Sequence, residues 1–209
     1  MLESNQPIVL YGYSGHAFVV ADAILKCKLA LYGYIDFQPS NKNYYKLEYI
    51  GFERDVNFTG WKKGYGFVLA VGNNQLRRTF FENLIAQNER AINIFHPSAV
   101  ISDLTSISNG VVILANANVN PLAQLGNGVI VNTGATVEHE CKIGDFVHIA
   151  PGVTLAGNVE VGENTFIGAN AVVKEGVKIG KNVVVGAGTV VVKDIQDKMK
   201  IYGNPGKIR

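Results

Sequence analysis

The sequence predicts an α/β domain followed by a three-sided parallel β-helix, on the basis of a six-residue repeat and a strand-turn-helix opening. In the second half of the chain an aliphatic residue occupies every sixth position without one polar interruption. These positions are Ile101, Ile107, Ile113, Val119, Leu125, Val131, Val137, Ile143, Ile149, Leu155, Val161, Ile167, Val173, Ile179, Val185 and Val191. A prism with about six residues per face and eighteen per coil keeps all of these side chains inside.

The first 95 residues read as a small domain of their own. An apolar run over residues 7–11 ends in Gly12, and a tight turn then leads into a helical segment over residues 17–25. Such a turn points free backbone N–H groups beyond the strand end, which suits a phosphate. The glycine spacing is not that of a dinucleotide fingerprint, so a purely structural turn is an open alternative.

Further strands and a helix complete this first domain. A second apolar strand over residues 31–35 ends in Asp36, where an acid can approach a ribose or base. A third strand is expected over residues 68–71, followed by a turn that begins at Gly72 and a helix over residues 75–88. The predicted result is a Rossmann-like parallel βαβ domain.

We assign residues 1–95 to this domain and residues 96–209 to the β-helix with its C-terminal tail. No apolar run approaches about 18 residues, and the N-terminus lacks the order of a signal peptide. Cys27 and Cys141 are too few for a disulfide framework, and Cys141 falls on an inward position. We therefore expect a cytoplasmic protein that binds no membrane.

Small residues follow the inward aliphatic residues and are expected to turn the corners of the prism. The glycines at these positions are Gly144, Gly162, Gly168, Gly180 and Gly186. One edge is small throughout, since eighteen-residue stacking aligns two columns. The columns are Ala150, Gly168 and Gly186, with Pro151, Ala169 and Ala187 beside them. This edge predicts a groove for a narrow amide-bearing chain such as pantetheine, unless the small residues only turn corners.

Charge is distributed unevenly along the β-helix. Residues 97–173 hold one base and six acids, whereas residues 174–209 hold eight bases and three acids. The C-terminal end therefore suits an anionic ligand such as a phosphorylated cofactor, although a solvated lysine-rich tail is the plain alternative. No aromatic residues interleave with the bases, so nucleic acid is not an expected partner.

Two histidines of the β-helix are candidates for acid-base chemistry. His139 lies at a corner, with Gly157 one coil above it, and Glu140 is its candidate carboxylate partner if the corner bends. His148 lies in the middle of a face beside the small-residue edge. Half a coil separates the two histidines, so they can meet only between subunits, and a homotrimer is the hypothesis that brings them together.

Several motifs in order resemble those of bacterial sugar-nucleotide acetyltransferases. These are the hexapeptide repeats, Tyr11-Gly-Tyr-Ser-Gly-His16, Gly72-Asn-Asn74, Phe95-His-Pro-Ser-Ala-Val-Ile101, Asn132-Thr-Gly-Ala-Thr-Val-Glu-His-Glu140 and Gly203-Asn-Pro205. The sequence is most similar to the UDP-4-amino-sugar N-acetyltransferases of the bacillosamine pathway. Perosamine N-acetyltransferases and sialic-acid O-acetyltransferase-like proteins are related to it, and nearly the whole chain is covered.

The resemblance implies a left-handed β-helix, a homotrimer and acetyl-CoA bound between adjacent β-helices. It implies that His139 is the general base, Glu140 its polarising partner, and His148 a neighbour of the acetyl thioester. Ala169 and Ala187 match positions that contact the CoA arm. The implied nucleotide-sugar site consists of Gly12, Ser14, Gly15, His16, Asp36 and Gly72. Tyr13 departs from the pattern, since relatives often have a small residue there.

The expected function is direct transfer of an acetyl group to the 4-amino group of a nucleotide-linked sugar. Two alternatives stay open: O-acetylation of a sugar hydroxyl, and a non-catalytic scaffold that binds a sugar nucleotide. A zinc enzyme built on such a β-helix would need three imidazoles around the metal. Of the four histidines, His16 and His96 lie outside the regular coils, so no metal site is expected.

Overall fold

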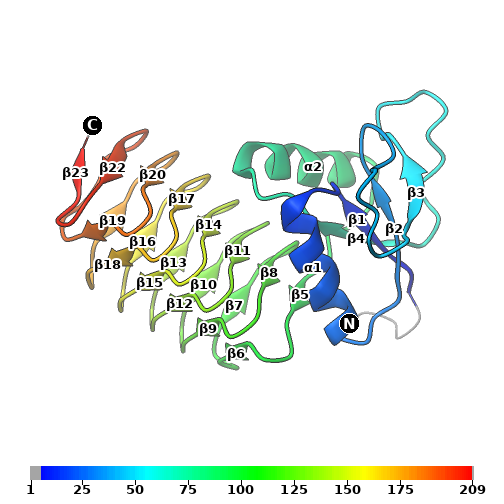
Figure 1. The fold of residues 1–209 in the computed structure, drawn as a ribbon. Helices are drawn as coiled ribbons and strands as arrows, with labels where there is room; N and C mark the ends of the chain where they lie inside the picture. Colours follow the sequence, from blue (N-terminus) through cyan, green and yellow to red (C-terminus); the bar gives the residue numbers. More distant parts are fainter. Residues whose placement is uncertain (1–5, 209) are drawn as a thin grey trace.

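The computed structural model describes residues 6–208 as an α/β domain joined to a long β-helix (Figure 1). The α/β domain holds a parallel sheet in the order β3-β2-β1-β4 and two helices. Its elements are β1 (Ile8–Tyr11), α1 (Gly15–Lys26), β2 (Leu31–Ile35), β3 (Glu48–Gly51), β4 (Gly66–Leu69) and α2 (Asn74–Ala86). The predicted Rossmann-like arrangement is confirmed, but β3 was not predicted. This strand is a four-residue segment that begins with a glutamate and ends with a glycine, and its residues are exposed or only half-buried, so the sequence shows no apolar run there.

The two helices cover opposite faces of this sheet. Alternate residues of each strand point to opposite faces, so one set packs on α1 and the other on α2. Leu10 and Val68 pack in a cluster with α1, whereas Val9 and Phe67 pack in a cluster with Phe80 and Leu84 of α2. The α1 cluster also contains residues of the β-helix, namely Ile94, Val112 and Leu114. One apolar cluster therefore spans both domains, while the interior of the β-helix forms a separate cluster.

The β-helix has three faces built from strands of two residues each, and neighbouring strands on a face are parallel and eighteen residues apart for most of the length. The first face is β6 (Val100–Ile101), β9 (Asn118–Val119), β12 (Thr136–Val137), β15 (Thr154–Leu155), β18 (Val172–Val173) and β21 (Val190–Val191). The second face is β7 (Ser106–Ile107), β10 (Gln124–Leu125), β13 (Lys142–Ile143), β16 (Glu160–Val161) and β19 (Lys178–Ile179). The third face is β5 (Ile94–Phe95), β8 (Val112–Ile113), β11 (Ile130–Val131), β14 (His148–Ile149), β17 (Phe166–Ile167), β20 (Val184–Val185), β22 (Lys200–Tyr202) and β23 (Lys207–Ile208).

The third face extends the regular coils at both ends. Strand β5 precedes the predicted start at residue 96 and already pairs with β8. At the other end, Val185 pairs with Ile201, so the last coil is two residues shorter than the others, and β23 closes it antiparallel to β22. The coils form the left-handed parallel β-helix that the resemblance implied.

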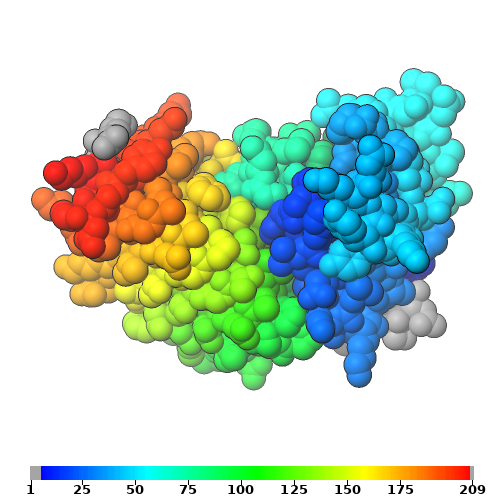
Figure 2. All heavy atoms as spheres, in the orientation of Figure 1, coloured from blue at the N-terminus to red at the C-terminus, as the bar shows by residue number. Residues whose placement is uncertain are grey.

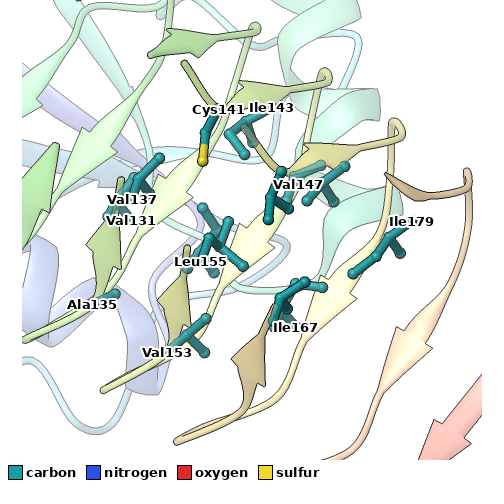
Figure 3. Packing of buried hydrophobic residues seen from close by; sticks show 14 of the residues in the cluster. Val131, Ala135, Val137, Cys141, Ile143, Val147, Val153, Leu155, Ile167 and Ile179 are labelled. Carbon is teal, nitrogen blue, oxygen red and sulfur yellow. The ribbon is translucent and has the colours of Figure 1, made fainter. Parts of the chain in front are cut away.

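Aliphatic side chains from all three faces fill the interior of the β-helix (Figure 3). Val137, Ile149 and Leu155 are fully buried, and Cys141 packs among them. Ile101 and Ile107 are only half-buried because they lie in the first coil, where no complete coil covers them. The predicted inward positions are thus confirmed along the regular coils.

The corners are made by different residues from those predicted. From Ile107 to Val185 the left-handed backbone conformation occurs three residues after each aliphatic position, as at Asn158, Asn164 and Asn182, where φ is 55–62°. The predicted corner glycines serve another purpose. A Cβ on Gly162 would lie 2.6 Å from the backbone nitrogen of Lys181, and one on Gly168 would lie 2.6 Å from that of Ala187. Coils stacked about 4.8 Å apart leave no room there for a side chain.

The α/β domain covers the early and middle coils, while the last coils, orange and red in Figure 2, lie away from it. Within residues 6–208 no helix is long and apolar enough to span a membrane.

Candidate functional site

His139 and Glu140 are hydrogen-bonded to each other at the edge between the first and second faces. The Nδ1 atom of His139 lies 3.0 Å from a carboxylate oxygen of Glu140, and both side chains are more than half exposed. Side chains of neighbouring residues diverge in an extended strand, but Glu140 has a φ of 61°. This left-handed bend turns the carboxylate back toward the ring, so the predicted pair forms. The carboxylate selects the tautomer with hydrogen on Nδ1 and leaves a lone pair on Nε2.

Gly157, one coil above, leaves the space that the His139 ring occupies. A Cβ at this position would lie 2.5 Å from Cε1 and 2.6 Å from Nε2 of His139. The predicted stacking of this glycine over His139 is therefore observed. The contact fixes one side of the imidazole, and more than half of the His139 side chain remains exposed.

A second cluster lies where the α/β domain meets the third face. Gly72 follows the carboxyl end of β4, and its carbonyl oxygen lies 3.0 Å from Nδ1 of His148 in β14. His16, in the first turn of α1, also packs on Gly72, and the centroids of the two imidazole rings are 5.9 Å apart. Three predicted site residues, far apart in the sequence, thus meet at one point.

Hydrogen bonds determine the tautomer of His148. The backbone N–H of Thr133 donates to Oδ1 of Asn132 at 2.8 Å, so the amide nitrogen of Asn132 faces the ring. That nitrogen lies 3.1 Å from Nε2 of His148. Nε2 therefore accepts from Asn132 while Nδ1–H donates to Gly72, and both ring nitrogens are engaged.

Burial keeps both imidazoles of this cluster neutral. Desolvation is the main cause that lowers the pKa of His16 to about 3, and the neighbouring His148 and Arg77 act in the same direction. Desolvation and the nearby Arg77 guanidinium lower the pKa of His148 to about 4, although its hydrogen bond to Gly72 acts in the opposite direction. Neither ring is therefore protonated near neutral pH, and each offers hydrogen-bonding atoms without a charge.

Acidification below about pH 6.5 is expected to destabilise the protein through these two rings. Between the folded values of about 3 and about 4 and the ordinary value of 6.5, the unfolded chain binds more protons than the folded one. Their stabilising contribution is complete above this range and is lost as the pH falls, with a slope of up to about 1.4 kcal/mol per pH unit for each ring. Urea unfolding between pH 7 and pH 5 measures this slope. His148→Gln should reduce it, and an unchanged slope would contradict a lowered pKa at His148.

The remaining predicted nucleotide-sugar residues lie around the turn between β1 and α1. Gly12 has a φ of 93°, and its N–H donates to the carbonyl of Ile35, whereas Ser14 and Gly15 are exposed at the start of α1. Asp36 accepts the N–H of Tyr13 on one oxygen and the N–H of Phe37 on the other. The carboxylate therefore holds the turn against the end of β2.

Tyr13, which departs from the pattern of relatives, is buried. Its ring stacks on Tyr34 with centroids 4.2 Å apart, and its hydroxyl donates to Asn43 at 3.1 Å. Asn43 also accepts from the N–H of Leu47. The tyrosine thus anchors the loop between β2 and β3 beside Asp36.

Ala169 and Ala187 lie on the edge between the third and first faces, where Ala169 is half-buried and Ala187 is exposed. A cavity of about 460 Å³ lies nearby on the third face, and Phe166, one of its lining residues, packs edge-on against His148. The cavity is lined by Gly72, Asn73, Asn74, Gln75, Asn164, Phe166, Asn182, Val183 and Val184. A larger hollow of about 710 Å³ on the second face contains none of the predicted site residues.

Within one chain the predicted site residues therefore lie in separate groups. His16, Gly72 and His148 come together, whereas His139 with Glu140, and Ala169 with Ala187, lie on two other edges. Asn132 was not singled out by sequence reasoning, although it is the polar member of a column that continues with Ala150 and Gly168. Within residues 6–208 no group of His, Cys, Asp or Glu side chains is arranged to hold a metal ion.

Comparisons with known proteins agree with this architecture. The family model described as the PglD N-terminal domain matches residues 7–84, and the bacterial transferase hexapeptide model matches residues 122–157 and 158–193. The acetyltransferase domain of PglB from Neisseria gonorrhoeae FA1090, solved with acetyl coenzyme A, is 35% identical. The match covers 98% of this chain and 100% of that chain, with a TM-score of 0.92. The chain belongs to the PglD-type hexapeptide-repeat acetyltransferases.

Two further members of this acetyltransferase family are similar. PerB from Caulobacter crescentus, solved with CoA and GDP-perosamine, is 33% identical over 100% of this chain and 99% of that chain, with a TM-score of 0.91. UDP-N-acetylbacillosamine N-acetyltransferase of Bacillus subtilis (strain 168) is 41% identical over 49 residues, which is 23% of this chain and 23% of that protein. The resemblance inferred from the motifs is therefore confirmed.

Proposed function

We propose that the protein transfers the acetyl group of acetyl-CoA to the 4-amino group of a nucleotide-linked amino-deoxy sugar. The observation that carries this proposal is the His139–Glu140 pair, in a chain that belongs to this acetyltransferase family. The pair presents an imidazole with Nδ1 bonded to a carboxylate and with no hydrogen-bond partner for Nε2 among residues 6–208. Such an arrangement suits a general base that works near neutral pH.

The proposed reaction is a direct transfer through a ternary complex. Nε2 of His139 takes a proton from the amine as its nitrogen attacks the thioester carbonyl carbon. The new C–N bond forms, the C–S bond breaks, and the CoA thiolate leaves and takes the proton from the imidazolium. Bringing the amine and the thioester together supplies about 7 kcal/mol or more. No cysteine or serine nucleophile is needed.

The cluster of His16, Gly72 and His148 offers hydrogen-bonding groups for the acetyl group and the sugar. The amide of Asn132 uses one N–H toward His148 and keeps another, which can steady the oxyanion. The Nε2 atom of His16 is buried and has no partner in the described part of the chain, so a polar group of the nucleotide sugar can satisfy it. We assign the sugar nucleotide to the turn with Gly12 and Gly72, near both rings.

The CoA arm is assigned to the edge that carries Ala169 and Ala187. Small side chains there leave the backbone accessible to the amides of pantetheine, and the excess of bases after residue 173 suits the phosphates of CoA. His139 lies on the opposite edge of the first face, too far round the prism for one chain to complete the site.

A homotrimer completes the site by placing His139 of one chain against the His148 groove of the next. The first face and the His139 edge expose large apolar side chains, among them Val100, Leu104, Leu122 and Val172. Large apolar side chains exposed on one side of the molecule suit an interface with a second copy. The α/β domain covers the third face instead, so the first face is available to a second copy.

Complementation tests this assembly. His139→Ala and His148→Ala are each expected to be inactive, but co-expression should produce mixed trimers. In a head-to-tail ring every mixed trimer holds one site with both histidines, so random mixing should restore about a quarter of wild-type activity. No recovery, with mixed trimers shown by mass spectrometry, would place both histidines in the same chain's site.

Thiol release from acetyl-CoA tests the activity. The acceptors are nucleotide-linked 4-amino-6-deoxy sugars and their 4-hydroxyl counterparts, with UDP, GDP or dTDP as the nucleotide. Fast release with an amino sugar, and an N-acetyl product by mass spectrometry, are expected. Release with the hydroxyl sugars alone would indicate an O-acetyltransferase, and nucleotide-sugar binding without release would indicate a scaffold.

A further inference from the structure

Arg77 is a fully buried guanidinium that bridges the two domains. It lies in the first turns of α2 and is 0% exposed. None of the ion pairs in residues 6–208 involves it. Burial lowers its pKa to about 9, so it stays charged near neutral pH. An uncompensated buried charge needs strong hydrogen bonds to persist.

All five N–H donors of Arg77 find acceptors. Nε donates to the carbonyl of Gly128 at 2.7 Å, and one terminal nitrogen donates to the carbonyls of Val71 and Gly72 at 3.2 and 3.1 Å. The other terminal nitrogen donates to Oδ1 of Asn74 at 2.9 Å and to the carbonyl of Phe146 at 2.8 Å. The guanidinium therefore joins the turn after β4 to two stacked corners of the β-helix, those at Gly128 and Phe146.

These contacts fix both ends of the hydrogen bond between His148 and Gly72. The Gly72 carbonyl that accepts from His148 also accepts from Arg77. On the other side, Arg77 holds the carbonyl of Phe146, two residues before His148 at the start of β14. A shift of the guanidinium would therefore move the acceptor and the strand that carries the donor.

We propose that Arg77 is a positioning residue for acetyl transfer: it sets the place of His148 and, through that ring, the orientation of the Asn132 amide. The inference rests on the proposed function, in which Asn132 and His148 face the acetyl thioester. Arg77 itself touches neither substrate. Its effect passes through the Gly72 carbonyl to the ring, and from Nε2 of the ring to the amide.

The test compares Arg77→Lys with Arg78→Gln. Lysine keeps the charge but offers three donors in place of a planar fork. Arg78 crosses the same domain interface, where it binds Glu163 at 2.8 Å and lies over the Phe146 ring, but within residues 6–208 it donates no hydrogen bond to the Gly72 or Phe146 carbonyl. With the folded fraction measured by circular dichroism, Arg77→Lys should lower kcat per folded molecule about 10²-fold, the order expected for a misplacement of about 1 Å. The KM for acetyl-CoA should change much less, and Arg78→Gln should retain kcat.

Nitrogen-15 NMR of the His148 ring gives a readout that does not depend on activity. The wild type should show hydrogen on Nδ1, and Arg77→Lys should show a mixture of tautomers. If Arg77→Lys does not fold, Asn74→Ala, which removes one acceptor of the fork, should shift the tautomer and kcat in the same direction to a smaller extent.

The possible outcomes separate the two proposals. If the wild type transfers acetyl and the variants keep its kcat and its tautomer, Arg77 only stabilises the domain interface and the inference is wrong. If the wild type transfers acetyl to no acceptor, the proposed function is wrong, and the tautomer measurement still shows whether Arg77 positions His148.

Discussion

Replacement of His139 by alanine is expected to lower kcat by about 10²–10⁴-fold, the usual share of a general base. The variant lacks the Nε2 lone pair that, in the proposed mechanism, takes the proton of the attacking amine. The ring is more than half exposed and contributes nothing to the apolar core, so the fold should be retained. Acetyl-CoA affinity should hardly change, because the thioester arm is assigned to another edge. Steady-state kinetics with acetyl-CoA and the best amino sugar, together with calorimetric titration of acetyl-CoA, measure both quantities.

Two neighbouring carboxylates provide matched variants for this experiment. Glu140→Ala removes the oxygen that lies 3.0 Å from Nδ1 of His139, and it should lower kcat in the same direction. Glu138 stands on the other side of His139 in the sequence, but the carboxylate that bonds the ring belongs to Glu140. Glu138→Gln should therefore leave kcat within a few-fold. Near-normal turnover of His139→Ala would refute the role of the base.

Substitution of Gly157 by alanine is expected to lower kcat about 10²-fold with little effect on stability. The new Cβ would lie 2.5 Å from Cε1 of His139, so the ring must move by about 1 Å to reach van der Waals contact. A displacement of that size costs about 10²-fold when it changes the approach of a reacting group. Because the ring projects into solvent, it can move at small cost to folding. Kinetics and thermal unfolding of the same preparation measure the two effects.

Gly64→Asn is the control for this substitution. Gly64 lies at an exposed turn of the α/β domain with a φ of 74°, and a Cβ there would meet nothing within 4 Å. Asparagine adopts the same left-handed conformation elsewhere in the chain, as at Asn158 and Asn164. Neither kcat nor the unfolding temperature should change. Equal losses of activity in Gly157→Ala and Gly64→Asn would mean that the loss does not come from the His139 ring.

Most of the β-helix could be predicted because its repeat constrains every sixth residue. Side chains at these positions must be apolar, and a shift of one residue would expose them, so Val137 and Ile149 could be placed inside from the pattern alone. The corners were harder to predict. Positions 162 and 168 require glycine because the backbone of the next coil passes close to them. This distance between coils is known only from the stacked structure.

The roles proposed for the His139–Glu140 pair and for the turn after β1 came from motifs, but the geometry of these residues could not be predicted. The pattern placed Glu140 beside His139, and the left-handed φ of Glu140 turned the carboxylate toward the ring. The sequence pattern of α2 did not indicate that Arg77 is buried. Arginine in an amphipathic helix is usually solvated, and the adjacent Arg78 looks the same in the sequence.

The sequence by itself determined the coil period, the inward side chains, the order of the domains and the family, because each depends on side-chain type at a fixed spacing. Only the tertiary structure decided which polar groups meet between the domains. The acceptors there are backbone carbonyls, those of Gly72, Gly128 and Phe146, and every residue carries such a group. Their selection depends on how the α/β domain packs on the third face, and that packing brings His16, His148 and Arg77 to one place.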